Sequence, residues 1–344
     1  MDLKKIVRKN IYNLEPYSCA RNEFSGEASV WLDANESPYN SPYNRYPDPL
    51  QADVKSVIAQ MRNVEPQQIF LGVGSDECID MVYRVFCQPG VDNVVAIEPT
   101  YGMYEVCAAV NDIDYRRAPL TADFEIDIEK IYTKIDANTK VIWICSPNNP
   151  TGNAFPRETI EAVCAGFGGI VVVDEAYIDF SDKGSMVAQL NRYPNLIVMQ
   201  TLSKAWASAS VRLGAAYASK EIIDIFNKVK YPYNINLLTQ RYALEMLGRR
   251  TEVEQWVATL VGERKRLTAE LQSVACVEKV FTSDANFLLV RVSNADNIYK
   301  YLQSQGIVVR NRNRVALCAG CLRFSVGTEE ENNRLLKALK EYGK

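Results

Sequence analysis

The sequence of 344 residues contains no histidine. This absence excludes every catalytic arrangement that needs an imidazole, including a Ser-His-Asp or Cys-His nucleophile and a histidine general base. It also excludes a zinc site with imidazole ligands. Acid–base chemistry in this chain therefore depends on lysine, tyrosine, cysteine or carboxylate side chains, or on a cofactor.

Long apolar runs and a strong charge of either sign are also lacking. No stretch of about 18 apolar residues occurs, so we expect no membrane partner. The first ten residues are too charged to form the core of a signal peptide. The net charge of -3 gives no reason to expect nucleic acid or an anionic membrane as a partner.

The cysteines indicate a reducing compartment. Their number, nine, is odd and their spacing is scattered, which is typical of a cytoplasmic protein. Cys318 and Cys321 form a lone C-x-x-C pair. A four-ligand metal site needs a second pair at a suitable spacing, so we expect this pair to be structural and no metal to be bound.

The middle of the chain alternates short apolar runs with helical stretches. The runs are continuous rather than alternating, which indicates strands that are buried on both faces. Alternating strands and helices predict an α/β domain with a mostly parallel sheet. The expected strands are residues 69–73, 93–97, 140–145, 169–173, 196–200 and 212–218.

The last hundred residues have a different pattern. A long helical stretch over 235–274 precedes short strands and helices, which predicts a smaller α+β domain. Residues 1–44 are rich in proline and asparagine, and we expect this N-terminal arm to pack with the small domain. The large domain is then expected at 45–235 and the small domain at 236–344.

Polar residues directly follow several predicted strands. In open α/β sheets, ligands bind at this carboxyl edge. By its position alone, Lys204 could be a surface charge or a site residue. Asp174 ends an apolar strand, so its carboxylate needs a cationic partner such as a protonated pyridine nitrogen, unless it caps a helix. The residues at this edge are Asn148, Asp174, Tyr177, Ser203 and Lys204.

Two segments have features of an anion site. Gly74 and Ser75 lie in a strand-to-helix turn, where Ser75 is expected as the N-cap and free N–H groups attract phosphate. Such a turn is also common without a ligand, and it lacks the full dinucleotide and P-loop patterns. Thr201 and Ser203 supply hydroxyl groups near Lys204, and Arg212 can bind a phosphate with two donors.

Together these residues resemble the fold-type-I enzymes that use pyridoxal 5'-phosphate (PLP), specifically the aminotransferases. The motifs that carry this resemblance are Gly74-Ser75-Asp76, Pro99-Thr100-Tyr101, Pro147-Asn148-Asn149-Pro150-Thr151-Gly152, Asp174-Glu175-Ala176-Tyr177, Ser203-Lys204 and Arg212. Narrower motifs resemble the histidinol-phosphate aminotransferase family of class II. These are Leu14-Glu15-Pro16-Tyr17, Leu32-Asp33-Ala34-Asn35-Glu36, Asn44-Arg45-Tyr46-Pro47-Asp48, Pro99-Thr100-Tyr101-Gly102-Met103-Tyr104 and Cys321-Leu322-Arg323-Phe324-Ser325-Val326-Gly327-Thr328.

The resemblance implies a large PLP-binding domain around a seven-stranded sheet, and roles for its site residues. Lys204 would bond covalently to PLP and later move a proton. Asp174 would pair with the pyridinium nitrogen, which keeps the ring an electron sink. Asn148 and Tyr177 would contact the 3'-oxygen of the ring, and Tyr101 would stack on it.

The resemblance also implies how the cofactor phosphate is held. Tyr46 would reach the phosphate of the neighbouring subunit's cofactor, which makes the enzyme a homodimer with shared active sites. The residues expected around the phosphate within one subunit are Gly74, Ser75, Asp76, Thr201, Ser203 and Arg212.

Substrate binding is expected to rest on arginines. Arg323 matches the family residue that would hold 2-oxoglutarate or glutamate and would also meet a substrate phosphate. Arg310 lies thirteen residues earlier, as expected for a second anion-binding arginine. Arg312 and Arg314 share its strand face, so either could be the functional residue instead. The other expected substrate contacts are Tyr17, Asn35, Tyr46 and Asn148.

The resemblance implies an enzyme that transfers the amino group of L-histidinol phosphate to 2-oxoglutarate, with imidazole acetol phosphate and glutamate as products, in histidine biosynthesis. An aminotransferase for aromatic amino acids and a PLP-dependent decarboxylase of a phosphorylated amino acid are the alternatives. A non-catalytic protein with this fold is disfavoured by Lys204. A nicotinamide dehydrogenase is disfavoured because the G-x-G-x-x-G motif is lacking.

Overall fold

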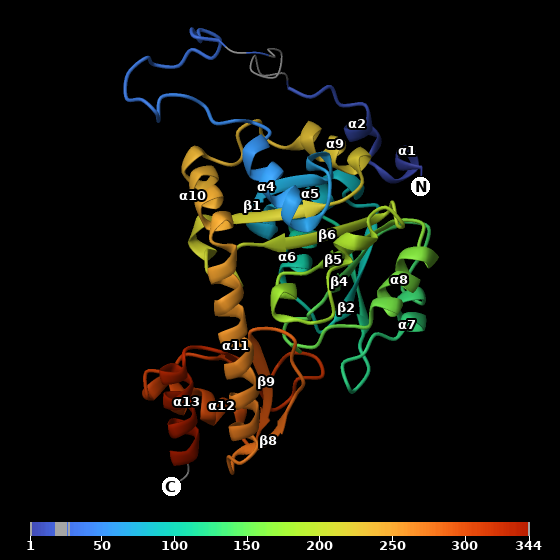
Figure 1. Ribbon diagram of the computed structural model, residues 1–344. Helices are drawn as coiled ribbons and strands as arrows, with labels where there is room; N and C mark the ends of the chain where they lie inside the picture. Colours follow the sequence, from blue (N-terminus) through green and yellow to red (C-terminus); the bar gives the residue numbers. More distant parts are fainter. Residues whose placement is uncertain (1, 18–25, 27, 343–344) are drawn as a thin grey trace.

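A computed structural model describes residues 2–17, 26 and 28–342. Its large domain contains a seven-stranded sheet in the order β1-β7-β6-β5-β4-β2-β3 (Figure 1). β7 runs antiparallel to both of its neighbours, and all other neighbouring pairs are parallel. The expected mostly parallel sheet is therefore confirmed. The strands are β1 (Ile69–Val73), β2 (Asn93–Glu98), β3 (Asp114–Pro119), β4 (Thr139–Cys145), β5 (Ile170–Asp174), β6 (Leu196–Thr201) and β7 (Leu213–Tyr217).

Apolar side chains cover both faces of this sheet, as its continuous apolar strands require. In β5, Val171 and Val173 join one core cluster, whereas Ile170 and Val172 join the other. The first cluster packs under α4 (Ala52–Arg62), α7 (Ile128–Tyr132), α8 (Arg157–Gly166) and α10 (Leu237–Gly248). The second packs under α5 (Gly74–Phe86), α6 (Met103–Val110) and α9 (Lys220–Val229). Short 3-10 helices are η1 (Pro66–Gln68), η2 (Ile178–Phe180), η3 (Met186–Gln189) and η4 (Ala209–Val211).

The small domain is built around a four-stranded antiparallel sheet in the order β10-β11-β9-β8. Its strands are β8 (Val277–Val280), β9 (Phe287–Val292), β10 (Arg310–Asn311) and β11 (Cys321–Ser325), and its helices are α12 (Ala295–Ser304) and α13 (Glu329–Glu341). The long helix α11 (Arg250–Leu271) connects the two domains (Figure 1). Its residue Val253 belongs to a large-domain core cluster, whereas Leu267 belongs to the core of the small domain.

The expected division of the chain needs two corrections. The N-terminal arm starts on the large domain and not on the small domain. It begins with α1 (Leu3–Ile6) and α2 (Lys9–Tyr12), and Val7 between them is buried in the core cluster under α5 and α9. Residues 28–47 then lie at the end of the molecule opposite the small domain (Figure 1). α10 also belongs to the large domain, since it packs on that domain's core, so the boundary lies within α11 rather than at residue 236.

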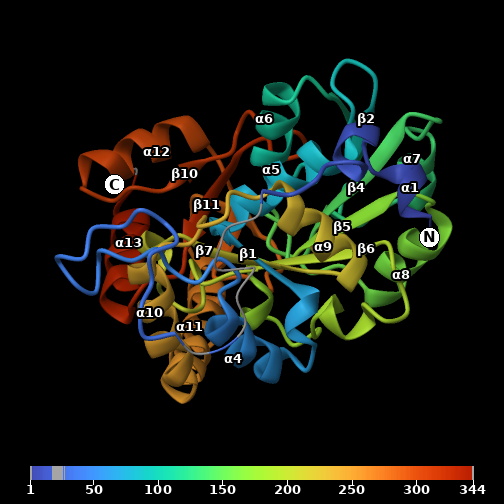
Figure 2. The same cartoon turned by 90° about the horizontal axis from the view of Figure 1, so that it is seen from above.

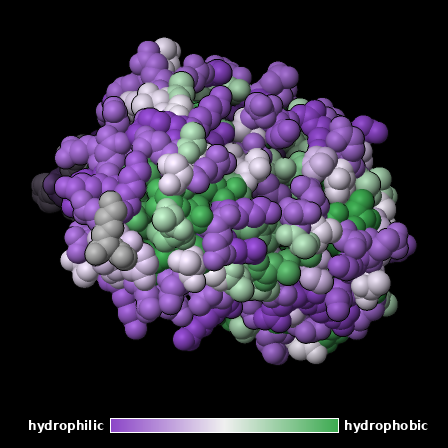
Figure 3. Space-filling view, turned by 90° about the horizontal axis from the view of Figure 1, so that it is seen from below, coloured by the Kyte–Doolittle hydropathy of each residue, from purple (hydrophilic) through white to green (hydrophobic). Residues whose placement is uncertain are grey.

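In the view from above, α12 and α13 of the small domain lie at one side of the molecule and α7 and α8 of the large domain at the other (Figure 2). No helix within the described part of the chain is long and apolar enough to cross a membrane. The surface at the small-domain end is mostly hydrophilic, with apolar residues exposed in places (Figure 3).

Candidate active site

A cavity of about 790 Å³ lies at the carboxyl ends of the parallel strands, and strands of the small domain close its other side. Ligands of open α/β sheets bind at this edge. The cavity brings together most of the predicted site residues. The predicted residues that line it are Ser75, Asp76, Tyr101, Asp174, Tyr177, Thr201, Ser203, Lys204, Arg212, Arg310 and Arg323.

Asp174 ends β5 and is only 2% exposed. One carboxylate oxygen accepts a hydrogen bond from the Tyr104 hydroxyl at 2.6 Å, and the other accepts one from the Ala176 amide at 3.0 Å. Burial raises the pKa of Asp174, because the ionised form loses its hydration. Within the described chain, no lysine or arginine lies within 4.0 Å of this carboxylate, so it is well placed to receive a cation from a ligand.

Tyr104 is a site residue to which the sequence analysis gave no role, although it ends one of the motifs that carry the resemblance. It lies in the first turns of α6, is fully buried, and its ring stacks on Trp143 at 4.7 Å. Tyr104 holds the Asp174 carboxylate in one orientation through its hydroxyl. The sequence signal was weak, since a buried tyrosine in a helix is more often part of a core than of a site.

Lys204 lies in the turn after β6, where its backbone oxygen accepts a bond from the Ala207 amide. Its ammonium lies 5.6 Å from the centroid of the Tyr177 ring. Burial is the main cause that lowers the pKa of Lys204, and the positive charge of Arg323 lowers it further. A lysine with a lowered pKa has more of its amine in the neutral form that can act as a nucleophile or a base.

The start of α5 forms a narrow cradle for an anion. The helix begins at Gly74, so Ser75 lies inside its first turn and is not the N-cap that we expected. The Gly74 amide donates to the Arg212 carbonyl at 3.0 Å, but no side chain in the described residues caps this helix, so the following N–H groups of its first turn can meet an anion. A Cβ atom on Gly74 would lie 2.3 Å from the Arg212 guanidinium, and a Cβ on Gly214 would lie 2.3 Å from the Ser75 nitrogen.

Hydroxyl groups and charges surround this cradle. Thr201 donates to Ser203 through their hydroxyls at 2.9 Å. Arg212 lies 3.3 Å from the Asp76 carboxylate, and Tyr101 donates to the same carboxylate at 3.3 Å. The predicted phosphate-binding residues are therefore gathered at one end of the cavity, next to the start of α5.

The asparagine motif needs a correction. Asn148 is fully buried and does not line the cavity, because its amide donates to the Pro99 oxygen at 2.9 Å and to Thr151 at 2.8 Å. Asn149 lines the cavity instead. Its amide donates to the Tyr177 hydroxyl at 3.5 Å, and its oxygen accepts a hydrogen bond from Arg323.

Arginines line the opposite end of the cavity. Arg310 on β10 lies directly opposite Arg323 on β11 in the antiparallel ladder. Arg312 and Arg314 line the same cavity. Burial lowers the pKa of Arg323 to about 10, and the charge of Arg312 adds to this effect more than that of Arg310. This end of the cavity therefore has an excess of positive charge.

Three predicted residues lie elsewhere. Tyr17 is 76% exposed and lines no part of the cavity. Tyr46 stacks on Tyr233 with ring centroids 4.4 Å apart, and Asn35 and Tyr46 line a separate hollow beside the start of α10. One chain by itself therefore does not bring these residues to the cavity.

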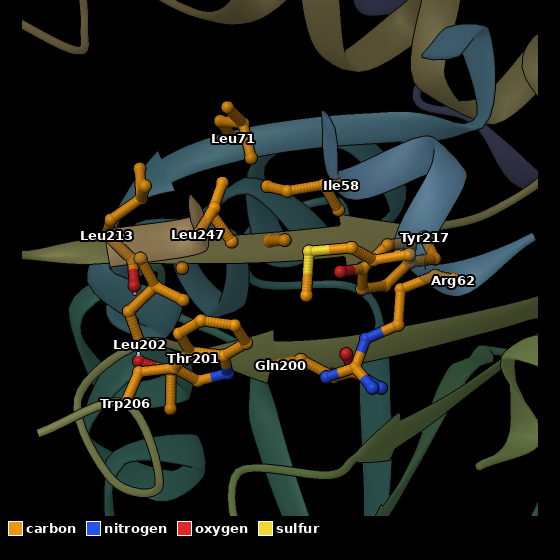
Figure 4. Close-up of a pocket in the computed structure, with 13 residues that line it drawn as sticks. Ile58, Arg62, Leu71, Gln200, Thr201, Leu202, Trp206, Leu213, Tyr217 and Leu247 are labelled. Carbon is orange, nitrogen blue, oxygen red and sulfur yellow. Dashed lines mark hydrogen bonds between the residues drawn. The ribbon is translucent and has the colours of Figure 1, made fainter. Parts of the chain in front are cut away.

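A second, smaller cavity of about 30 Å³ lies between α4 and the sheet (Figure 4). Aliphatic and aromatic side chains line most of it, including Trp206 and Tyr217, and Arg62 and Gln200 also reach it. This space can hold a water molecule but is too small for a substrate.

Comparisons with known proteins agree with this geometry. The family model described as aminotransferase class I and II matches residues 19–339. A histidinol-phosphate aminotransferase from Bacteroides thetaiotaomicron is 52% identical over 341 residues, with 99% of each chain covered. A solved histidinol-phosphate aminotransferase from Clostridium acetobutylicum has a TM-score of 0.80 and 27% identity, covering 87% of this chain and 90% of its own. The chain belongs to the class I and II aminotransferases.

Aminotransferase membership confirms the predicted family and implies PLP as the cofactor. A solved histidinol-phosphate aminotransferase from Sinorhizobium meliloti in complex with pyridoxal-5'-phosphate has the same fold, with a TM-score of 0.79, 21% identity, and coverage of 90% of this chain and 89% of its own. The cavity fits such a group. It combines a buried carboxylate without a cation, a lysine with a lowered pKa, and a glycine-lined cradle at a helix start.

Proposed function

We propose that this aminotransferase transfers the amino group of L-histidinol phosphate to 2-oxoglutarate, with imidazole acetol phosphate and glutamate as products, in histidine biosynthesis. The observation that carries this proposal is the 52% identity, over 99% of both chains, to a histidinol-phosphate aminotransferase. The cationic end of the cavity supports it, because a phosphate monoester needs several positive donors.

The proposed cofactor is PLP, which supplies a carbonyl that bonds to amines and a ring that accepts electrons. We assign Asp174 to the ring nitrogen, Tyr177 and Asn149 to the ring 3'-oxygen, and Tyr101 to the ring face. The cofactor phosphate is assigned to the start of α5. The side chains proposed to hold that phosphate are Ser75, Thr201, Ser203 and Arg212.

Lys204 is the proposed catalytic residue. Its side chain reaches the cavity from the turn after β6, beside Tyr177, and its pKa is lowered by burial and by Arg323. When its amine is free, the Nζ atom can take a proton from the substrate carbon and return it at another position. No histidine is needed for this proton transfer, in agreement with the composition.

Arg323 is the proposed anion-binding residue for both substrates. Its guanidinium is bound to Asn149 and lies 5.0 Å from the centroid of the Phe287 ring, which orients it toward the cavity. A guanidinium can bind a carboxylate or a phosphate with two parallel hydrogen bonds. The same residue therefore serves glutamate, which has a carboxylate, and histidinol phosphate, which has none.

We propose a homodimer in which Tyr46 and Asn35 complete the partner's site. The arm carries apolar side chains that lack cover within one chain, since Val30 is 69% exposed and Leu32 is 91% exposed. Burial of such side chains against a second copy would stabilise the dimer. The cytoplasm is the proposed location, because all eight described cysteines are free.

Product analysis of the PLP-loaded enzyme tests this function. With L-histidinol phosphate and 2-oxoglutarate, we expect glutamate in equal amount to the substrate consumed. Phenylalanine and O-phosphothreonine serve as rival substrates in parallel reactions. Faster turnover of phenylalanine would assign an aromatic aminotransferase instead, and carbon dioxide release from O-phosphothreonine without a keto acid would assign a decarboxylase.

A further inference from the structure

Lys230 directly follows α9 and is buried, with 8% of its surface exposed. Its ammonium donates to three backbone oxygens, those of Pro49 at 2.7 Å, Pro232 at 2.8 Å and Tyr231 at 3.2 Å. An ammonium has three N–H donors, so these carbonyls match it in number, and a buried charge is costly without such partners. The partner at Pro49 lies 181 positions earlier in the chain. Lys230 therefore joins the base of the N-terminal arm to the loop 230–236.

Tyr46 lies at the same base and is linked to the same loop by stacking. Its ring stacks on that of Tyr233 with centroids 4.4 Å apart and planes 10° apart, and Tyr233 lies three residues after Lys230. On the arm, Pro47 and Pro49 restrict the backbone between Tyr46 and the bound carbonyl. The polar contact and the aromatic contact therefore fix the same short segment of the arm.

Further hydrogen bonds anchor this segment to the core of the large domain. The buried Gln51 amide also donates to the Pro49 oxygen, at 2.7 Å. The Asn234 amide donates to the Leu71 oxygen of β1 at 2.8 Å and to the Glu77 carboxylate of α5 at 3.2 Å. Because the loop is fixed to the sheet and to α5 in this way, the arm residues that are bound to the loop are fixed as well.

We propose that Lys230 is a positioning residue that acts on the partner's cofactor site through Tyr46. This inference rests on the proposed function, in which Tyr46 of one copy completes the site of the other. Tyr46 is 49% exposed, so a single chain covers only part of it. A hydroxyl that meets a group on a second copy binds it more tightly when its position is fixed beforehand, because ordering a loose segment on binding lowers affinity. Lys230 supplies that order from within its own subunit.

The affinity of the full-length dimer for PLP tests this role, and titration measures it without turnover. Tyr46→Phe removes a charge-assisted hydrogen bond to the cofactor phosphate and should raise the dissociation constant of PLP by about 10- to 150-fold. Lys230→Met keeps the hydroxyl but loosens the segment that carries it. We expect the dissociation constant to rise by about 10-fold, because the segment must then be ordered when the cofactor binds.

Two comparisons separate positioning from a structural role. In the Tyr46→Phe background, Lys230→Met should change the PLP affinity by less than about twofold, since Lys230 acts through the hydroxyl that is already lost. In mixed dimers with one Lys204→Ala subunit, only the other subunit can bond covalently to PLP, so the absorbance of the bonded cofactor reports on one site. Lys230→Met should weaken that site when it is placed on the Lys204→Ala subunit, and not when it is placed on the reporting subunit.

Lys55→Met is the matched control. Lys55 is 6% exposed, and burial together with the charge of Lys230 lowers its pKa to about 8. Its replacement removes a neighbouring ammonium but keeps the bonds of Lys230, so the PLP affinity should stay within about twofold of wild type. Gln51→Met removes only the second donor to Pro49 and should give a smaller loss than Lys230→Met. This milder variant decides the question if Lys230→Met does not form a dimer.

Each outcome has a distinct meaning. Wild-type affinity in Lys230→Met, or an additive loss in the double variant, would overturn the proposal. A defect that stays with the subunit carrying Lys230→Met would also overturn it, because it would assign a structural role within one chain. If Tyr46→Phe bound PLP as tightly as wild type, the proposed role of Tyr46 would be wrong, and this inference with it. If histidinol phosphate failed as a substrate, the proposed reaction would be wrong, whereas Lys230 would still be judged by PLP binding.

Discussion

Replacing Asp174 by asparagine removes the charge of this side chain while nearly keeping its shape. Exposed ion pairs contribute about 0–1 kcal/mol, whereas breaking a buried pair costs about 3–5 kcal/mol. Asp174 is 2% exposed, so its pairing with a cofactor ring nitrogen belongs to the second class. We therefore expect Asp174→Asn to weaken cofactor binding by about 100- to 4,000-fold.

Without cofactor, the same substitution has the opposite effect on stability. Burial raises the pKa of Asp174 above its ordinary value in the unfolded chain. When the pKa of a carboxyl group is higher in the folded protein than in the unfolded chain, the folded protein loses stability as the pH rises. The loss begins near the pKa in the unfolded chain, about 3.9, and continues through the pKa in the folded protein. Asparagine does not titrate, so the cofactor-free variant should melt at or above the wild-type temperature at neutral pH.

Pyridoxamine 5'-phosphate is a suitable probe, because it enters the same site without bonding to Lys204. Its affinity is measured by titration, and the melting temperature is measured with and without it. Glu175→Gln is the matched control, since Glu175 is equally buried but its carboxylate binds Ser185, Met186 and Gln200 rather than the cavity. Wild-type affinity in Asp174→Asn would refute the assigned role of Asp174.

Further predictions concern residues around the site. Burial raises the pKa of Glu175 to about 7. The free energy of unfolding of the cofactor-free protein should therefore fall by about 3 kcal/mol between about pH 4.5 and 7, and Glu175→Gln should remove this loss. Urea unfolding at several pH values measures both. Asn149→Ala should lower kcat/KM with little effect on folding. Asn148→Ala should instead destabilise the fold by about 1–3 kcal/mol, because its buried partners lose a donor. Thermal scans and kinetics distinguish the two variants. Arg62→Met should lower the unfolding free energy by about 1.5–3 kcal/mol, because the bond to Asp179 at 3.0 Å is lost, with unchanged KM.

Sequence patterns predicted the buried strands but missed two edge strands. β4, β5 and β6 are continuous apolar runs that only a buried sheet explains. β3 has the sequence Asp-Tyr-Arg-Arg-Ala-Pro at one edge of the large sheet, where charged side chains reach solvent. β8 lies at the edge of the small sheet with a similar polar pattern. Edge strands carry polar residues that protect them from pairing with other chains, so hydrophobicity cannot reveal them.

The candidate site was predicted to the level of motifs, and single residues within a motif needed the structure. Asn148 and Asn149 are adjacent and identical in type, so only the backbone path decides that Asn149 reaches the cavity. Tyr104 joins Asp174 across 70 positions of sequence, and no local pattern encodes that contact. The three arginines of 310–314 likewise differ only in the partners that the fold gives them.

The placement of Arg323 links substrate binding to the basicity of Lys204. The charge of Arg323 lowers the pKa of Lys204, so an anion that binds Arg323 offsets this effect and raises the proton affinity of a free Lys204 amine. The lysine then gains affinity for a proton when a substrate that can release one is bound. Arg323→Gln should remove this coupling and raise the pKa of Lys204, so that the acidic limb of its kcat/KM profile, where the base is lost by protonation, lies at higher pH than in wild type. An unchanged limb would show that the two charges act independently, in spite of their position in one cavity.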